Sequence, residues 1–223
     1  MVHQARRTAP DAGPRRLHLG EHRPTPEQQF ARPAQQACRV ATDPDVAVGE
    51  QHVAPAALAG QPVVDVGCGP GRLVAALSVR GVVALGIDVS PLAVALTRSR
   101  GAMALHRDVH DRLPGEGRWR HVLLADGNIG IGGDPARLLR RVRELLLRGG
   151  TVLTEVEPPG SGVRCGSARL VHHDTMHHDT AGPSFPWCRV SADAATTVAD
   201  AADLRLLSVA HHGGRWAALL QRR

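Results

Sequence analysis

The sequence predicts an α/β fold: a doubly wound, mostly parallel sheet with an antiparallel C-terminal hairpin strand. Short apolar runs alternate with helical patterns from residue 62 onward, as expected for strand-helix-strand units. An acid also stands at or just past the end of five predicted strands, namely Asp65, Asp88, Asp108, Asp126 and Glu155. A single acid there is often a helix cap or a surface charge. Five in register indicate a site, because ligands of open α/β sheets bind outside the carboxyl ends of the strands.

Turn and capping residues delimit the expected elements. Ser90 caps one helix and Pro91 opens it, while Asp134 and Pro135 do the same for another. Strands are expected at residues 63–65, 82–87, 102–105, 122–125 and 151–156, followed by a hairpin of 206–210 and 216–220. Helices are expected at residues 73–80, 91–100, 135–148, where Gly149 and Gly150 follow, and 192–204. Residues 157–190 have no clear period and are expected to be irregular.

The chain of 223 residues has the length of one domain. Residues 1–42 are rich in Arg, Pro, Gln and His without periodicity, which predicts a flexible arm. Residues 43–223 form the expected domain, with a weak helical pattern at 43–58 and an insertion at 157–191 on the substrate side. No apolar run is long enough for a membrane span or a signal peptide, so we expect a cytoplasmic protein.

The composition excludes several kinds of chemistry. All 27 residues of the Lys+Arg count are Arg. A chain without lysine has no Walker-loop lysine, no Schiff base and no lysine general base. The net charge of +6 reflects a bias toward arginine, and 2% aromatic residues leave few rings for stacking bases. Nucleic acid is therefore an unlikely partner on sequence grounds.

The cysteines and histidines predict no metal site. Cys38, Cys68, Cys165 and Cys188 lie far apart without a Cys-x-x-Cys pair, so we expect free thiols. His-His-Asp-Thr occurs twice, at residues 172–175 and 177–180. A bound metal is one interpretation of this repeat, but adjacent histidines on an extended segment point to opposite faces. A solvated loop is the interpretation we prefer.

The loop Asp65-Val66-Gly67-Cys68-Gly69-Pro70-Gly71 indicates the ligand. A dinucleotide fingerprint needs a third glycine at the sixth position, where Arg72 or Val74 stands instead. Acid-x-Gly-x-Gly-x-Gly resembles the first motif of class I S-adenosylmethionine-dependent methyltransferases, which have a Rossmann-like fold. Asp88, 21 residues after Gly67, lies where that family has its ribose-binding acid.

The resemblance covers about residues 60–156 and implies a set of cofactor contacts. Gly67, Cys68, Gly69 and Gly71 would line the methionine portion of S-adenosyl-L-methionine, and Asp65 would lie near its ammonium group. Asp88, with Val89 next to it, would hold the ribose hydroxyls. Asp108 would bind the adenine amine with Val109 beside the ring, and Asp126 would lie near the transferable methyl group.

Methyl transfer requires mainly alignment of the reactants. The resemblance places Asp126 and Asn128 at the reacting centre, and His106, His110, Glu155 and Glu157 are further candidates for a general base. The segment Ala125–Gly130 lacks the two prolines and the aromatic ring of DNA amino-methyltransferases. We therefore expect an enzyme, a methyltransferase, with a small-molecule acceptor. An RNA or protein methyltransferase and a binding protein that performs no transfer remain the alternatives.

Phe185 and Trp187 are the candidates for contact with the acceptor. These scarce rings lie between the fifth strand and the last helix, where the fold commonly inserts substrate-contacting segments. The alternative is that they pack as a plug against the edge of the sheet.

Overall fold

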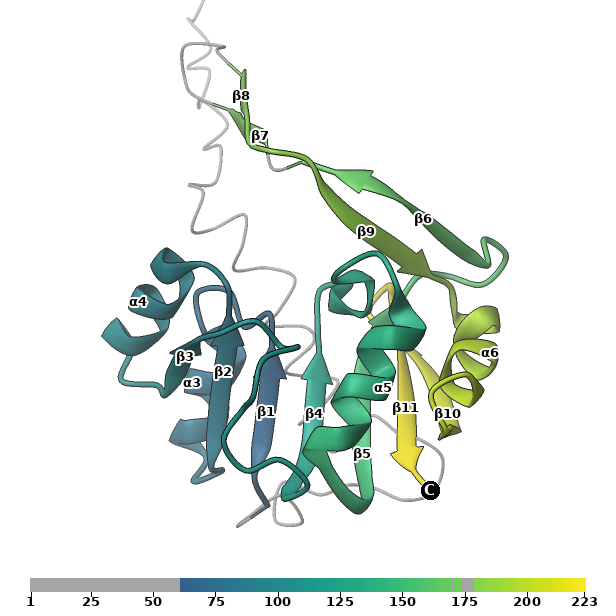
Figure 1. Ribbon diagram of the computed structural model, residues 1–223, viewed down its shortest axis with the longest axis horizontal. Coiled ribbons are helices and arrows are strands. Elements are labelled where there is room, and N and C mark those ends of the chain that lie inside the picture. Colours follow the sequence, from purple (N-terminus) through teal and green to yellow (C-terminus); the bar gives the residue numbers. More distant parts are fainter. Residues whose placement is uncertain (1–60, 170, 174–178) are drawn as a thin grey trace, which may run out of the picture.

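A seven-stranded sheet forms the centre of the protein (Figure 1). The computed structural model describes residues 61–169, 171–173 and 179–223. The strand order is β10-β11-β5-β4-β1-β2-β3, and only β11 runs against its neighbours. The predicted fold class is thus confirmed. The strands are β1 (Val63–Val66), β2 (Ala84–Asp88), β3 (Ala104–His106), β4 (Trp119–Leu124), β5 (Leu146–Val156), β10 (Leu204–His212) and β11 (Arg215–Arg222).

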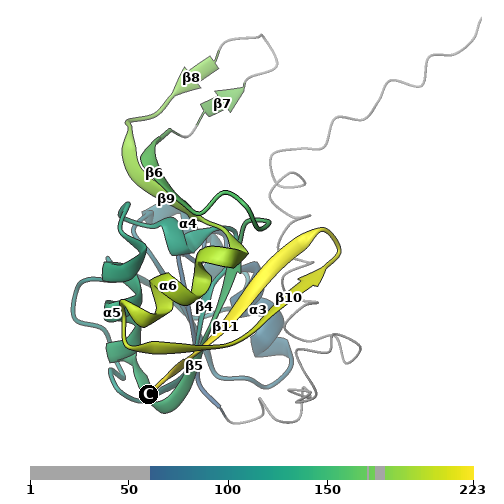
Figure 2. The same cartoon turned by 90° about the vertical axis from the view of Figure 1, so that its right-hand side faces the viewer.

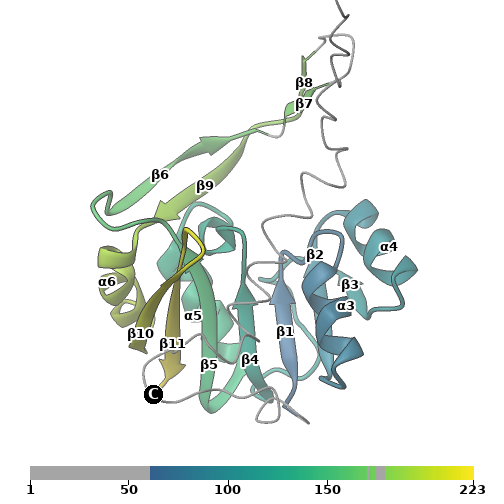
Figure 3. The same ribbon diagram turned by 180° about the vertical axis from the view of Figure 1, so that it is seen from behind.

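Helices cover both faces of this sheet. Helices α3 (Arg72–Val79) and α4 (Pro91–Ser99) lie on one face, and α5 (Pro135–Leu145) and α6 (Ala195–Asp200) lie on the other (Figures 1 and 3). The predicted caps form, since the Ser90 side chain accepts from the Ala93 amide and the Asp134 side chain accepts from the Arg137 amide. Short 3-10 turns are present at η1 (Asn128–Gly130) and η2 (Ala192–Ala194).

Helix α5 ends earlier than its apolar pattern predicts. Leu146 is extended (φ −75°, ψ 143°) and pairs with Trp119 as the first residue of β5. The next pair joins Thr151 to His121, so residues 147–150 form a bulge in β5. Leu145 and Leu146 are both fully buried, one from the helix and the other from the strand. The apolar run therefore continues from α5 into β5, so the sequence pattern does not show where the helix ends.

The last helix is also shorter than expected. We expected it at residues 192–204, but it ends at Asp200. Asp203 has a positive φ of 53°, which a helix cannot accommodate, and Leu204 begins β10 with its side chain fully buried. Burial of this leucine in the sheet takes precedence over the helix propensity of the alanines before it.

Residues 157–190 are not irregular, as we expected them to be. β6 (Val163–Ala168) pairs antiparallel with β9 (Phe185–Val190), and β7 (Val171–His173) pairs with β8 (Asp179–Ala181). We call the described part of this segment, residues 163–169, 171–173 and 179–190, the ribbon; it rises above the carboxyl ends of the parallel strands (Figures 1 and 2). β6 is exposed along most of its length, so its side chains have no inward-facing alternation from which to predict a strand.

Two of the four expected free thiols form a disulfide. Cys165 and Cys188 stand directly opposite each other in the β6–β9 pair and are joined. This pairing depends on the register of the ribbon, which cysteine spacing alone does not reveal. Cys68 is a free, buried thiol, as predicted.

Several predictions concern residues outside the described ranges: the arm at 1–42, the helix at 43–58, Cys38 and most of the histidine repeat. No helix among the described residues is long and apolar enough to cross a membrane.

Candidate active site

The glycine loop after β1 has a closed side and an open side. Gly67, Gly69 and Gly71 all have positive φ angles, of 72°, 53° and 76°. A Cβ atom on Gly67 would lie 2.6 Å from Asn128 Nδ2, and one on Gly71 would overlap the Thr97 side chain. A Cβ atom on Gly69 would meet no atom within 4 Å. The loop is therefore packed against the domain on one side and open on the other, as a cradle for a ligand requires.

Asp88 holds this loop against the end of β2. Its Oδ2 accepts from the Gly69 amide at 2.9 Å, and its Oδ1 accepts from the Ser90 amide at 2.8 Å. Each carboxylate oxygen keeps a second lone pair, so the group can still accept hydroxyl donors from a ligand. Val89 next to it is exposed, and its carbonyl contacts His106 Nε2 at 2.9 Å.

Asp65 is a buried acid, only 2% exposed, behind the same loop. In the described part of the chain, no group donates a hydrogen bond to its carboxyl. Burial, and then the nearby carboxylates Asp126 and Asp88, raise the pKa of Asp65 to about 7, while Arg72 opposes the shift. A cationic ligand group would favour the charged form of this acid.

The Cys68 thiol of the loop is mostly buried and lies beside a small cavity. Burial, followed by the charge of Asp65, raises the pKa of the Cys68 thiol to about 12, so Cys68 is a neutral packing residue rather than a nucleophile. A small cavity connects the loop with the start of α3 and the end of β4. It is lined by Asp65, Gly67, Cys68, Arg72, Leu73, Ala125 and Asp126.

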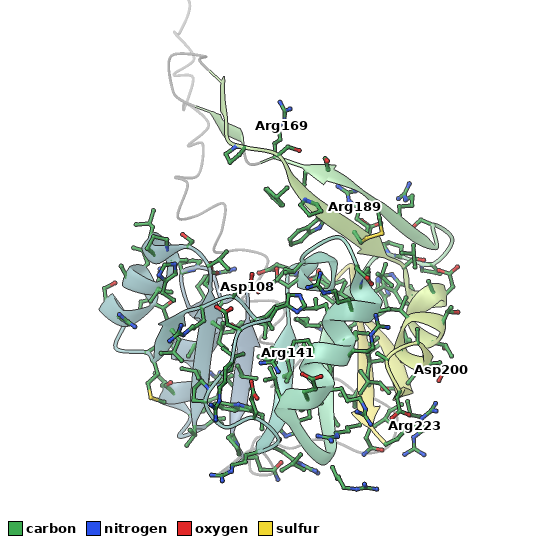
Figure 4. The ribbon with its side chains drawn as sticks, in the orientation of Figure 1. Asp108, Arg141, Arg169, Arg189, Asp200 and Arg223 are labelled. Carbon is green, nitrogen blue, oxygen red and sulfur yellow. A yellow bond between two sulfur atoms is a disulfide. The ribbon has the colours of Figure 1, made fainter. Side chains whose placement is uncertain are left out.

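The two residues expected at the adenine differ in exposure. Asp108 is exposed at the upper edge of the sheet (Figure 4), where its Oδ1 accepts from the His110 amide at 2.9 Å. The Val109 side chain is buried in the main core, and its carbonyl accepts from Arg141 Nε at 2.8 Å. Contact of these two residues with a cofactor stays a prediction.

Asn128 connects the loop after β4 to the loop after β1. Its Nδ2 donates to the carbonyls of Val66 and Gly67, both at 2.9 Å. We expected Asn128 at the reacting centre. In this structure its amide nitrogen positions the glycine loop.

Asp126 lies in an ionic cluster formed by four elements. It has a strained positive φ of 53°, and its amide donates to Glu155 Oε2 at 2.8 Å. Arg215, at the start of β11, donates to Asp126 Oδ1 at 2.9 Å and to Glu155 Oε1 at 2.8 Å. Arg72 lies 3.3 Å from Asp126 Oδ2. Sequence reasoning missed Arg215, which is 89 residues from Asp126 and belongs to no motif.

A pocket of about 340 Å³ opens between the ends of β4 and β5 and the ribbon strand β9. We call it the acceptor-side pocket. Trp187 is one of its walls, and Phe185 packs edge-to-face on Trp187 with ring centroids 5.9 Å apart without lining the pocket itself. The lining is Asp126, Gly127, Ile129, Glu155, Val156, Glu157, Trp187, Cys188, Arg189 and Val190. It shares Asp126 with the cavity at the glycine loop.

Comparison with known proteins agrees with this arrangement. A family model described as a methyltransferase domain matches residues 63–150. No match was found among curated protein sequences.

Solved structures share the fold at low identity. The CcbJ methyltransferase from Streptomyces caelestis is 20% identical with a TM-score of 0.56, covering 75% of this chain and 86% of that one. The sugar N-methyltransferase KedS8 from Streptoalloteichus is 17% identical with a TM-score of 0.59, covering 100% and 99%. The 1,6-didemethyltoxoflavin-N1-methyltransferase from Burkholderia thailandensis is 17% identical with a TM-score of 0.55, covering 96% and 92%. Residues 63–150 are thus similar to a methyltransferase domain, and the chain shares the fold of these methyltransferase structures.

Proposed function

We propose that this protein is an enzyme that transfers a methyl group from S-adenosyl-L-methionine to a small molecule. One observation carries the proposal: an open glycine cradle and a pocket of about 340 Å³ lie side by side and share Asp126. A methyl donor in the cradle and an acceptor in the pocket would then meet near that residue.

The residues of the cradle suit the donor. Gly69 leaves room for close approach, Asp88 has lone pairs free for ribose hydroxyls, and buried Asp65 favours an ammonium group. Asp108 is accessible to the adenine amine. When bound, the cofactor supplies an electrophilic methyl group on a sulfonium, so the protein's main task is to align the acceptor with it.

The size of the acceptor-side pocket supports a small acceptor. Its volume lies near the lower end of the roughly 300 to 1,000 Å³ that is typical of small-molecule sites. Two proteins of the same fold are described as a sugar N-methyltransferase and as a 1,6-didemethyltoxoflavin-N1-methyltransferase. The loop after β4 also lacks the prolines and the ring that hold a flipped base.

The cofactor assignment is tested by thermal unfolding with S-adenosylhomocysteine. At about one hundred times its dissociation constant this ligand should stabilise the protein by about 2.7 kcal/mol. Asp88→Ala should abolish most of the effect, because it removes the acid and releases the Gly69 amide. Asp200→Ala is the control, since Asp200 is exposed and far from the site (Figure 4). A melting curve that responds to a nicotinamide dinucleotide but not to S-adenosylhomocysteine would refute the assignment.

A further inference from the structure

The acceptor-side pocket contains three carboxylates, and two of them are already occupied. Glu155 Oε1 accepts from Arg215 Nε, and its Oε2 accepts from the Asp126 amide. Asp126 accepts from Arg215 at one oxygen and pairs with Arg72 at the other. Arg215 is only 14% exposed, so these contacts are partly shielded from solvent. Neither acid is readily available to a ligand.

Glu157 is the third carboxylate, and its situation is different. Its two oxygens lie 3.4 Å from Arg164 and 3.4 Å from Arg189. Both arginine side chains are more than 60% exposed, and ion pairs of this kind contribute little and exchange readily with solvent. The Glu157 side chain is therefore accessible to a ligand in the pocket.

The backbone of Glu157, by contrast, is firmly held. Its amide donates to the Val190 carbonyl at 2.8 Å, and its carbonyl accepts from the Ala192 amide at 2.9 Å. These bonds fix the point where β5 leaves the sheet against the point where the ribbon returns. An accessible carboxylate on a fixed backbone, in a pocket that Trp187 also lines, is suited to bind a cation.

We propose that the acceptor-side pocket takes a basic amine, bound as its ammonium form between Glu157 and Trp187, and that Glu157 removes its proton. This inference rests on the proposed methyltransferase function. In the first step an N–H bond of the ammonium breaks, its proton passes to the Glu157 carboxylate, and the nitrogen keeps the electron pair. That pair forms the new N–C bond to the methyl carbon, while the C–S bond breaks and its electrons return to sulfur. The product is the N-methylammonium ion, and Glu157 then releases its proton to water.

An anionic acceptor bound by Arg164 and Arg189 is the competing possibility. Neither guanidinium is held by a buried partner among the described residues, and both side chains are mostly exposed. Tight recognition of a carboxylate or phosphate depends on a guanidinium held in a fixed geometry. The restrained group in this pocket is Glu157, which favours a cation.

The test compares three probes of one shape on the protein saturated with S-adenosylhomocysteine: benzylamine, benzyl alcohol and benzoate. Titration followed by NMR at pH 7 should give benzylamine the highest affinity, about tenfold above benzyl alcohol, because a charge-assisted hydrogen bond replaces a neutral one. Glu157→Gln should remove this preference. Glu144→Gln, which neutralises an exposed acid on α5, should keep it.

The outcomes separate this inference from the proposed function. Binding of S-adenosylhomocysteine without any preference for benzylamine overturns the amine inference alone, and so does tightest binding of benzoate. A preference that survives in Glu157→Gln removes Glu157 from the role. If the unmodified protein does not bind S-adenosylhomocysteine, the methyltransferase proposal itself is refuted. With S-adenosylmethionine and benzylamine as substrates, mass spectrometry should detect N-methylbenzylamine. Glu157→Gln should form this product more slowly than the unmodified protein. The difference between the two rates should decrease as the pH rises toward the pKa of benzylamine, because more of the amine is then already deprotonated.

Discussion

At the scale of single residues, Arg215 connects the two acids that follow β4 and end β5. It holds Glu155 through two nitrogens and Asp126 through one, and Glu155 in turn holds the strained Asp126 backbone. One arginine from the antiparallel strand thus pairs with two acids at the ends of two parallel strands. Without it, these carboxylates would repel each other at the border between the cradle and the acceptor-side pocket.

Arg215→Ala should therefore lower the free energy of unfolding by about 2 kcal/mol, the range expected for hydrogen bonds to charged groups. Denaturant unfolding measures the change. Glu155→Gln introduced into Arg215→Ala should recover part of the loss, because Glu155 is then the carboxylate without an arginine partner, whereas Asp126 keeps Arg72. Arg223→Ala is the control, since Arg223 pairs with Asp200 on the surface and both side chains are about half exposed. This change should alter the free energy of unfolding by less than about 0.5 kcal/mol. Equal losses in Arg215→Ala and Arg223→Ala would contradict this account.

At the scale of elements, the ribbon rests on the glycines of the loop after β4. A Cβ atom on Gly130 would overlap the Cys188 carbonyl, and one on Gly133 would lie 2.8 Å from Pro186 Cβ. These glycines allow β9 to lie directly on the loop that also contacts the cofactor cradle through Asn128. The ribbon consists of two separate two-stranded pairs and has an exposed surface in β6, so it depends on such contacts.

Gly130→Ala should displace β9 from this loop at a cost of roughly 1 to 3 kcal/mol, the usual range for overpacking. Its φ is not positive, so the effect measures the clash rather than backbone strain. Hydrogen exchange should show faster exchange in β6 and β9 and little change in β1. Gly166→Ala on β6, where a Cβ meets nothing within 4 Å, should be neutral. A stable Gly130→Ala variant with unchanged exchange would mean that β9 does not rest on the loop.

The disulfide between Cys165 and Cys188 should also stabilise the ribbon. Its removal by Cys165→Ser should cost about 3 kcal/mol in the chain-entropy account, given a sequence separation of 23 residues. The loss should concentrate in the ribbon, where limited proteolysis would detect it. Peptide mapping before and after reduction checks the bond itself, and alkylation of both cysteines without reductant would show that it is absent.

At the scale of the whole molecule, the buried Asp65 and the partly buried His121, on the adjacent strands β1 and β4, act on the same folding equilibrium. Asp65 is near the carboxyl ends of the strands, with its pKa raised by burial from 3.8 to about 7. His121 is near the amino ends, where burial and then the charge of Arg120 lower its pKa from 6.5 to about 4. His121 contacts Thr151 Oγ1 at 2.8 Å and Gln61 Oε1 at 3.0 Å, which suits a neutral ring.

The two groups have opposite effects on stability as the pH changes. Between pH 3.8 and about 7 the folded state binds more protons at Asp65 than the unfolded state, so this acid lowers stability as pH rises. Between about 4 and 6.5 the unfolded state binds more protons at His121, so this residue raises stability as pH rises. Between about pH 4 and 6.5, the stability of Asp65→Asn should therefore rise more steeply with pH than that of the unmodified protein. Denaturant unfolding at several pH values measures the two slopes. His121→Gln should shift the slope in the opposite direction, and parallel curves for all three proteins would contradict both assignments.

The sequence by itself determined the parallel core of the molecule and the glycine cradle. Helix caps such as Ser90 and Asp134, the buried strand runs and the Asp65–Gly71 loop are local patterns, because caps, periodicity and positive φ angles depend on residues a few positions apart. The mostly parallel sheet and its antiparallel C-terminal hairpin strand were predicted from the same patterns, whereas the strand order came from the structure. The boundary between α5 and β5 did not, since Leu145 and Leu146 are equally apolar and only their packing separates helix from strand.

Only the tertiary structure decided the acceptor side of the site. β6 is exposed along most of its length, so no hydrophobic alternation marks it, and its register with β9 decides which cysteines meet. Arg215 reaches Asp126 from 89 residues away because β11 pairs with β5, a contact that no local pattern encodes. Glu157 was one of several candidate bases in the sequence, and its accessibility depends on which arginines occupy the other acids. Long-range pairing of strands and charges is set by the fold as a whole, and for that reason these features could not be obtained from sequence periodicity.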